Sequence, residues 1–248
     1  MTDRSPLPIR VTLAFFPLTT GLAALWLGQD ASWDLRNYHF YNAFSFLAGR
    51  MGFDVAAAQV ATYYNPLLHL PFYYAVTTLA PKMVAFILGL IPGLNIFFLY
   101  GIARRVTPNE DTPRAQWFCL AVAVTGLLGA ATVSELGTSF GDNIVSLLVL
   151  CALWWVLKSH NQYEKLGAAK FTIIALVSGL ISGAALGLKQ PFAVYAVGMC
   201  AAFFGLSFSF QKRFFFAFVF GLGVLDGIAL TGGFWMFEMW HHFTNPPF

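Results

Sequence analysis

Apolar runs long enough to cross a bilayer recur along most of this 248-residue chain, and they constrain its fold more than any other feature. A membrane-spanning helix needs about 20 apolar residues, and inside a bilayer every backbone polar group must find an internal partner. Hydrophobic residues make up 58% of the sequence and charged residues 10%, against about 25% charged in an average soluble domain. The sequence therefore predicts an all-α polytopic bundle in a single membrane domain, residues 1–248.

Seven transmembrane spans are expected. The first apolar run is interpreted as a retained span, because no small-residue cleavage site follows it before Asp30. Gly179, Gly183 and Gly187 recur every four residues, a pattern that lets two membrane helices approach closely. The spans lie near residues 10–28, 83–103, 115–134, 143–158, 171–188, 190–210 and 214–234.

The segment Leu67–Ala80 decides the topology. It is apolar but short, and Pro71 and Pro81 interrupt and end it. If it does not cross, ten of the 14 Lys and Arg residues lie on the side of the N-terminus and four on the other side; if it crosses, these numbers reverse. Because cytoplasmic loops carry an excess of Lys and Arg, we expect a half-helix or re-entrant segment. The N-terminus is then cytoplasmic, and the first outer loop (residues 29–65) is periplasmic or extracellular.

Two carboxylates, Asp30 and Asp34, follow the first span in this loop, among Trp, Tyr and Asn residues. Ionisable groups at a membrane boundary are costly, which makes them candidates for a site. The segment Trp33–Arg50 is too polar to span and fits a helix along the membrane interface. Such a helix places Asp34, Tyr38 and Tyr41 on one face. Residues 55–62 are expected to form a second short helix.

Four charged residues are candidates for chemistry, each with a structural alternative. Asp34 and Asp142 suit the N-cap position of a helix, where a carboxylate accepts hydrogen bonds from free backbone amides. Asp30 is either a boundary residue or a member of the site. Lys189 follows a long apolar run, so it either extends to the headgroups or pairs with a phosphate or carboxylate as a point charge.

The remaining polar residues are interpreted structurally. Glu135 is expected to be a solvated loop carboxylate. His69 and Asp226 sit inside apolar runs, where a polar contact between helices explains them. His39 and the adjacent pair His241-His242 lack a spaced partner, so no metal site is predicted.

Several motifs follow one another in a fixed order. Asp34 precedes Tyr38 by four residues, Tyr63-Tyr64-Asn65-Pro66 opens the next apolar segment, and Arg104-Arg105 closes the following span. Asp142 then begins a later helix, and GLISGAALGLKQP ends a Gly-rich helix at Lys189. This order resembles that of the GT-C integral membrane glycosyltransferases, which include protein mannosyltransferases and lipid A aminoarabinose transferases. Leu35 replaces the family's usual second acidic residue. Members are commonly longer, so the C-terminal part of the usual length is expected to be absent.

The resemblance implies an inverting glycosyltransferase of the bacterial inner (plasma) membrane, acting in the cell envelope. It would move a sugar from a polyprenyl-phosphate donor to a lipid, glycan or protein acceptor on the outer face. Asp34 would be the general base, Lys189 would stabilise the phosphate, and Asp142 would orient the acceptor or hold a divalent cation. The candidate substrate-binding residues are Asp30, Tyr38, His39, Tyr64, Asn65 and Lys189.

The implied partners are the lipid-linked donor and the bilayer. Nucleic acid is not expected, because the basic residues are scattered between spans. The alternative is a non-catalytic polytopic protein, either a transporter of lipid-linked sugars or an assembly partner. A transporter places ionisable groups near the middle of the membrane, and only Asp226 and His69 are candidates for that.

Overall fold

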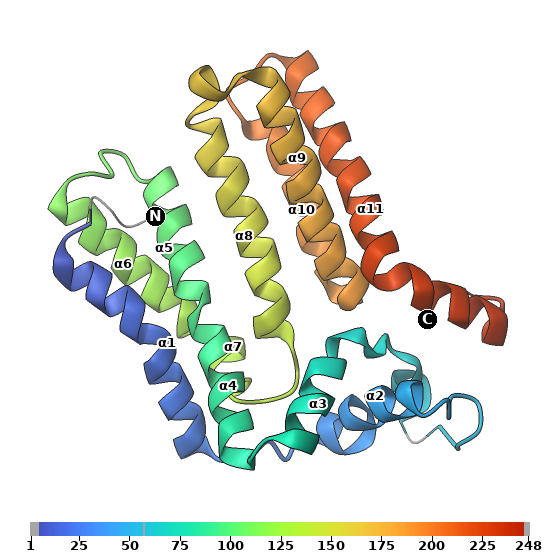
Figure 1. Cartoon of the computed structure of the whole chain (residues 1–248). Coiled ribbons are helices and arrows are strands. Elements are labelled where there is room, and N and C mark those ends of the chain that lie inside the picture. Colours follow the sequence, from blue (N-terminus) through green and yellow to red (C-terminus); the bar gives the residue numbers. More distant parts are fainter. Residues whose placement is uncertain (1–4, 57, 246–248) are drawn as a thin grey trace.

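The computed structural model describes residues 5–56 and 58–245, and these residues form helices and connecting segments without a β-strand (Figure 1). The predicted all-α class is confirmed. Arg4 and the end of the chain, residues 246–248, lie outside the described residues. The helices are α1 (Leu7–Leu27), α2 (Phe40–Leu47), α3 (Leu70–Thr78), α4 (Pro81–Gly93), α5 (Asn95–Val106), α6 (Pro113–Leu127), α7 (Ala130–Ser134), α8 (Asp142–His160), α9 (Tyr163–Leu188), α10 (Ala193–Ala202) and α11 (Phe210–Phe243).

Five helical segments of the described chain are long and apolar enough to cross a membrane, and they match five of the expected spans. These segments indicate an integral membrane protein. They are Leu7–Leu27, Pro81–Val106 (α4 with α5), Asp142–His160, Tyr163–Leu188 and Phe210–Phe243.

The other two expected spans are shorter than predicted. The 115–134 segment breaks after α6, which has 15 residues, and continues after Gly129 as the short α7. The 190–210 segment contains Pro191 near its start and forms the 10-residue α10 between two 3-10 turns, η4 (Gln190–Phe192) and η5 (Phe203–Gly205). At 1.5 Å per residue, α6 and the continuous helical run Gln190–Gly205 measure about 22 Å and about 24 Å, less than the roughly 30 Å of a hydrocarbon core.

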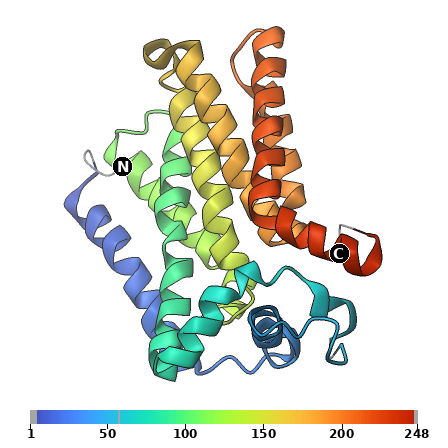
Figure 2. The same ribbon diagram turned by 45° about the vertical axis from the view of Figure 1, so that its right-hand side comes forward.

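Helices α9 and α11 pack against each other through glycines. A Cβ atom added at Gly179 would lie 2.1 Å from the Phe220 carbonyl oxygen, and one at Gly183 would lie 2.0 Å from that of Val224. The predicted close-packing face is therefore confirmed. The later glycine of α9 contacts the later residue of α11, so the two helices run parallel. The chain between them must return along the bundle, and α10 does so beside both helices (Figures 1 and 2).

The first outer loop and Leu67–Ala80 begin and end at the same end of the bundle. Helix α4 packs antiparallel to α1, with Gly89 against Ala24 and Gly93 against Thr20, so α4 starts where α1 finishes. The nine-residue α3 lies at that end, beside α2 (Figure 1). Leu67–Ala80 therefore does not run the length of the bundle, as predicted. We call this the loop end.

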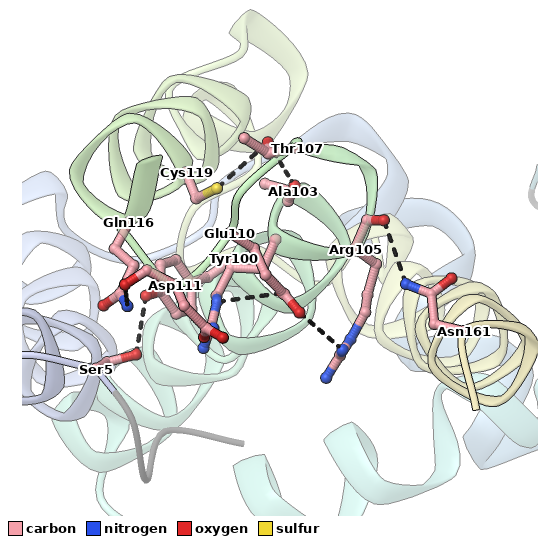
Figure 3. Close-up of polar contacts among 11 residues, drawn as sticks. Ser5, Tyr100, Ala103, Arg105, Thr107, Glu110, Asp111, Gln116, Cys119 and Asn161 are labelled. Carbon is pink, nitrogen blue, oxygen red and sulfur yellow. Dashed lines mark hydrogen bonds and ion pairs between the residues drawn. The ribbon is translucent and has the colours of Figure 1, made fainter. Parts of the chain in front are cut away.

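The opposite end is closed by a charge-paired turn between α5 and α6 (Figure 3). Arg104 pairs with Asp111 at 2.8 Å, and Arg105 pairs with Glu110 at 3.2 Å. The Asn161 amide donates to the Arg105 carbonyl at 3.4 Å and so ties this turn to the one between α8 and α9. An open depression of about 640 Å³ borders these residues. These charged side chains form ion pairs with one another, as in the ordinary turn expected from the sequence.

The interfacial helix of the first outer loop differs in detail from the prediction. It contains a π-helical turn, η1 (Leu35–His39), before α2. Tyr41 does not share a contact with Asp34; its hydroxyl donates to Asp54 at 2.8 Å instead. A π turn changes the angle between successive side chains around the helix. Tyr41 therefore does not share the predicted face with Asp34 and Tyr38. In place of the second helix expected over 55–62, the described residues form a short 3-10 turn, η2 (Gln59–Tyr63); residue 57 lies outside them.

Candidate functional site

A cavity of about 660 Å³ opens at the loop end, between the first outer loop and the ends of α9 and α11. Its wall combines aliphatic side chains with aromatic, imidazole and amide groups, and Lys189 at the end of α9 contributes a charge. The lining residues are Tyr38, His39, Tyr64, Asn65, Leu68, His69, Phe140, Leu186, Gly187, Leu188, Lys189, Gln190, Pro191, Ile228, Gly232, Trp235 and Met236. Four of the predicted substrate-binding residues besides Lys189 thus face one space: Tyr38, His39, Tyr64 and Asn65.

Lys189 and Asp142 form an ion pair at this cavity. Lys189 follows the last residue of α9, and its ammonium donates to Asp142 Oδ2 at 2.5 Å and to the Phe140 carbonyl at 2.9 Å. Gly141 makes the turn before α8 with a left-handed backbone (φ +81°), and a Cβ there would meet the Leu68 side chain at 2.8 Å. Glycine is needed at this position, and it directs Asp142 toward Lys189.

Neither candidate aspartate acts as a helix cap. Asp142 is the first residue of α8, whose N-cap is Gly141, and no side-chain hydrogen bond caps this helix. Asp34 precedes η1 without a capping hydrogen bond. The structural alternative for both residues therefore fails, and their side chains are engaged elsewhere.

Glu135 belongs to the same charged group, contrary to the prediction of a solvated loop carboxylate. Burial, and then the negative charge of Asp142, raise the pKa of Glu135 to about 7. Lys189 opposes this shift in pKa only partly. Two carboxylates near one ammonium cannot both ionise easily, so Glu135 retains a proton at mildly acidic pH.

Asp34 lies next to the cavity through Tyr38. Burial, and then the negative charge of Asp34, raise the pKa of Tyr38 above its ordinary range. The Tyr38 ring stands edge-on to His39, with ring centres 4.5 Å apart, and to Tyr64 at 5.7 Å. Asp34 therefore lies at the side of the cavity, while the tyrosine forms its wall.

Asp30 does not line this cavity. Its Oδ2 accepts from the Ser139 backbone amide at 2.9 Å and from the Ser139 hydroxyl at 2.8 Å, and Oδ1 accepts from the Ser32 amide at 2.9 Å. Burial raises the pKa of Asp30, but these hydrogen bonds outweigh it and bring the pKa below the ordinary value. Asp30 also borders a second cavity of about 460 Å³ beside α4. Its role is to join the first outer loop to the segment before α8.

Asn65 joins the first outer loop to the two helices that form the other side of the cavity. Its amide nitrogen donates to the Gly187 carbonyl at 2.8 Å and to the Thr231 carbonyl at 2.9 Å, and its oxygen accepts from the Leu67 amide at 3.0 Å. Nearby, the Trp235 indole donates to the Tyr63 carbonyl at 2.8 Å. The first outer loop is thereby fastened to the ends of α9 and α11, and the polar atoms of Asn65 are used in doing so.

His69 lies in the cavity wall at the loop end, whereas Asp226 lies near the middle of α11 (Phe210–Phe243). The His69 ring stacks on His39 in the cavity wall, with centres 4.2 Å apart, so it belongs to the loop end. Asp226 is exposed on α11 and makes no hydrogen bond within residues 5–56 and 58–245; the contact between helices that we expected for it is not formed there. Among the described residues, no three His, Cys, Asp or Glu side chains are grouped to hold a metal.

Three residues of this region were not assigned to the site from the sequence: Glu135, Ser139 and His69. Glu135 and Ser139 flank the short segment that leads to Asp142, so their proximity to a candidate aspartate was the one available signal. The comparisons found that no family model, curated protein or solved structure matches the chain. The functional argument therefore rests on the geometry of the cavity.

Proposed function

We propose that the protein is a membrane glycosyltransferase that moves a sugar from a polyprenyl-phosphate donor to a lipid, glycan or protein acceptor. The observation that carries this proposal is the meeting of Lys189, Asp142 and the Asp34–Tyr38 pair around one cavity at the loop end. These residues come from three distant stretches of the chain. A lysine and carboxylates beside an apolar-walled cavity suit a substrate with a phosphate, a sugar and a lipid tail.

The phosphate of the donor would bind at Lys189. A lysine ammonium is a compact point charge, and it stabilises negative charge that develops on a phosphate leaving group in the transition state. Asp142 neutralises this ammonium before the donor arrives. Because burial, and then the charge of Asp142, raise the pKa of Glu135 to about 7, Glu135 is partly protonated near neutral pH. The site then holds less negative charge than two free carboxylates would bring, which lessens the repulsion of an anionic ligand.

The carboxylate of Asp34 would act as general base. In a single displacement, the acceptor oxygen forms a bond to the anomeric carbon, and its proton passes to Asp34. The bond from that carbon to the phosphate oxygen breaks, and the polyprenyl phosphate leaves against Lys189 with inversion at the sugar. General base help of this kind contributes about 10²–10⁴ in rate. Asp34 lies close enough to Tyr38, which lines the cavity, for its charge to raise the pKa of the tyrosine.

The apolar wall and the position of the cavity suit a donor embedded in the bilayer. Leu68, Leu186, Ile228 and Met236 present aliphatic surface to the cavity, which can hold the first units of a lipid tail. With the N-terminus in the cytoplasm, Arg10, the basic pair Arg104-Arg105 and the other basic loops fall on the cytoplasmic side. The loop end then faces the periplasm of a bacterial inner membrane or the cell exterior.

The test is transfer of label from polyprenyl-phosphate sugars in membranes that contain the protein, its Asp34→Ala variant or its Asp54→Ala variant. Asp54 is a suitable control, because it lies in the same loop but pairs with Arg50 and Tyr41 away from the cavity. We expect transfer by the wild type and Asp54→Ala, and a loss of about 10²–10⁴ for Asp34→Ala. Equal transfer by Asp34→Ala would remove the assigned base, and no transfer by the wild type would remove the proposed function.

A further inference from the structure

A chain of hydrogen bonds runs from Asp30 through Ser139 to His39. The Ser139 hydroxyl lies 2.8 Å from Asp30 Oδ2, and the same oxygen lies 2.8 Å from His39 Nδ1. The Ser139 backbone amide donates to the same carboxylate at 2.9 Å. His39 and Ser139 are both buried, at 2% and 4% exposed. This arrangement fixes which group donates at each step.

The direction follows from the number of protons available. An ionised carboxylate only accepts hydrogen bonds, and a serine hydroxyl has a single proton to donate. The bonds from Ser139 and Ser32 keep the pKa of Asp30 low in spite of burial, so Asp30 is ionised at neutral pH. The Ser139 hydroxyl must therefore donate to Asp30. Its oxygen is left to accept, and the donor is the Nδ1–H of His39.

A neutral imidazole with its proton on Nδ1 has a lone pair on Nε2. His39 lines the 660 Å³ cavity, and within residues 5–56 and 58–245 no hydrogen bond to its Nε2 is present. The ring cannot turn freely, because His69 stacks on one face with 20° between the planes and Phe140 stands edge-on at 5.7 Å. The cavity wall thus contains one oriented acceptor that no described group uses.

We propose that His39 Nε2 binds a hydroxyl group of the sugar, and that Ser139 and Asp30 are positioning residues that hold His39 in the required tautomer. The identity of the ligand rests on the proposed function. A lone-pair acceptor binds a hydroxyl donor and repels a phosphate oxygen, whereas Lys189 attracts the phosphate. The two groups lie at the same cavity, so together they orient a sugar phosphate within it.

The environment of His39 keeps this acceptor available. Burial lowers the pKa of His39 to about 4; the positive charge of Lys189 also lowers it, while Asp34, Asp30 and Asp142 oppose the shift. The neighbouring His69 has a pKa lowered to about 3, by burial first and then by His39 and Lys189. Both rings are neutral at physiological pH. His39 therefore binds a hydroxyl without removing its proton, which leaves that step to Asp34.

The tautomer can be measured without any ligand. In protein labelled with ¹⁵N-histidine and dissolved in detergent, the chemical shifts of the two ring nitrogens show which one carries the proton. His39 is assigned as the signal missing from His39→Gln. We expect a protonated Nδ1 and an unprotonated Nε2 in the wild type, and loss of this preference in Ser139→Ala. A protonated Nε2 in the wild type would overturn the proposal. So would an unchanged tautomer in a folded Ser139→Ala variant.

The role of His39 in binding is tested with two variants, each of which keeps one of its two hydrogen-bonding groups and loses the other. An asparagine at position 39 places an amide N–H near the position of Nδ1, so His39→Asn keeps the donor to Ser139 and loses the acceptor. His39→Gln places an amide oxygen near the position of Nε2 and loses the donor. The probes are a polyprenyl-phosphate hexose and the same polyprenyl phosphate without sugar, with binding measured in detergent.

We expect His39→Asn to bind the hexose lipid about tenfold more weakly than the wild type, the effect of one lost hydrogen bond. His39→Gln should retain more of this affinity, and neither variant should change binding of the sugar-free lipid. A merely structural His39 would give the reverse order, with His39→Asn close to the wild type, and would refute the proposal. Failure of the wild type to bind either lipid contradicts the proposed function instead, while the nitrogen shifts still decide the tautomer.

Discussion

The Lys189 ammonium donates to Asp142 Oδ2 at 2.5 Å, although the two residues are 47 positions apart in the sequence. The left-handed Gly141 and the end of α9 bring them together, because one directs Asp142 into the cavity and the other ends the helix at Lys189. Glu135 belongs to the same group, because burial and then the negative charge of Asp142 raise its pKa to about 7. The pair is thus a charged centre, rather than a lysine extended to the headgroups and a capping aspartate.

Loss of the ammonium at position 189 should abolish most of the transfer reaction. We expect Lys189→Met to lower the rate of label transfer about 10²–10³-fold, the usual effect of removing one group that stabilises charge in a transition state. The control is Lys82→Met, since Lys82 is an exposed lysine at the start of α4, at the loop end but outside the cavity wall. The assay compares initial rates at equal amounts of folded protein. Similar rates for the two variants would show that Lys189 has no special role.

Glu135 should make the stability of the protein depend on pH. Its pKa is raised from 4.5 to about 7 in the folded state, by burial first and then by Asp142. The folded state therefore holds a proton that the unfolded chain has already released. Its contribution to stability is complete below about pH 4.5 and is lost as the pH rises through about 7.

Glu135→Gln removes this titration while keeping a hydrogen-bonding side chain. We expect the melting temperature of the wild type, relative to that of Glu135→Gln, to fall between pH 5 and pH 8. Thermal unfolding in detergent across this range measures it, and the difference between the two proteins cancels contributions from other groups. Parallel profiles would mean that Glu135 titrates in the folded state as it does in water.

Any side chain at position 183 should destabilise the protein, because α9 and α11 approach each other closely there. A Cβ there would lie 2.0 Å from the backbone oxygen of Val224, so Gly183→Ala forces the helices apart. Overpacking of this kind costs about 1–3 kcal/mol. At Gly221, also on α11, an added Cβ meets nothing within 4 Å, and Gly221→Ala should be neutral or slightly stabilising through helix propensity. Thermal unfolding of the two variants should separate them, and equal melting temperatures would contradict the packing.

The proposed orientation predicts which loops react with a thiol reagent that cannot cross membranes. Phe53 is 79% exposed in the first outer loop, and Gln162 is exposed in the turn between α8 and α9 at the opposite end. In intact cells we expect labelling of Phe53→Cys and not of Gln162→Cys, with both labelled after permeabilisation. The parent protein gives the background from Cys119, Cys151 and Cys200. Labelling of Gln162→Cys from outside would invert the topology and place the cavity on the cytoplasmic side.

Local patterns in the sequence were sufficient to predict much of the fold. The hydropathy of each run identified five helical segments of membrane-spanning length, and the spacing of Gly179, Gly183 and Gly187 identified the face that packs against α11. Two expected spans, 115–134 and 190–210, were too long in the prediction. The first breaks before Gly129 and the second ends at Gly205, and an average over apolar residues does not register where a helix ends.

The candidate site was only partly predictable. Lys189 was a candidate from its place at the end of an apolar run, and Tyr38, His39, Tyr64 and Asn65 were implied by the resemblance. All five line one cavity. The sequence did not predict that the Asn65 amide nitrogen donates hydrogen bonds to backbone carbonyls of α9 and α11. Nor did it show that Asp30 lies outside the cavity, or that Glu135 is coupled to Asp142.

The sequence by itself determined that the chain forms apolar helices and that its polar, aromatic residues collect in the segments between them. This is possible because the cost of placing a residue in a bilayer depends mainly on that residue and its neighbours along the helix. The tertiary structure alone decided that Asp30 and Ser139, 109 positions apart, would join the first outer loop to the segment before α8. Hydrogen bonds and charge pairs depend on distances of a few ångströms, and those are fixed by how the helices pack.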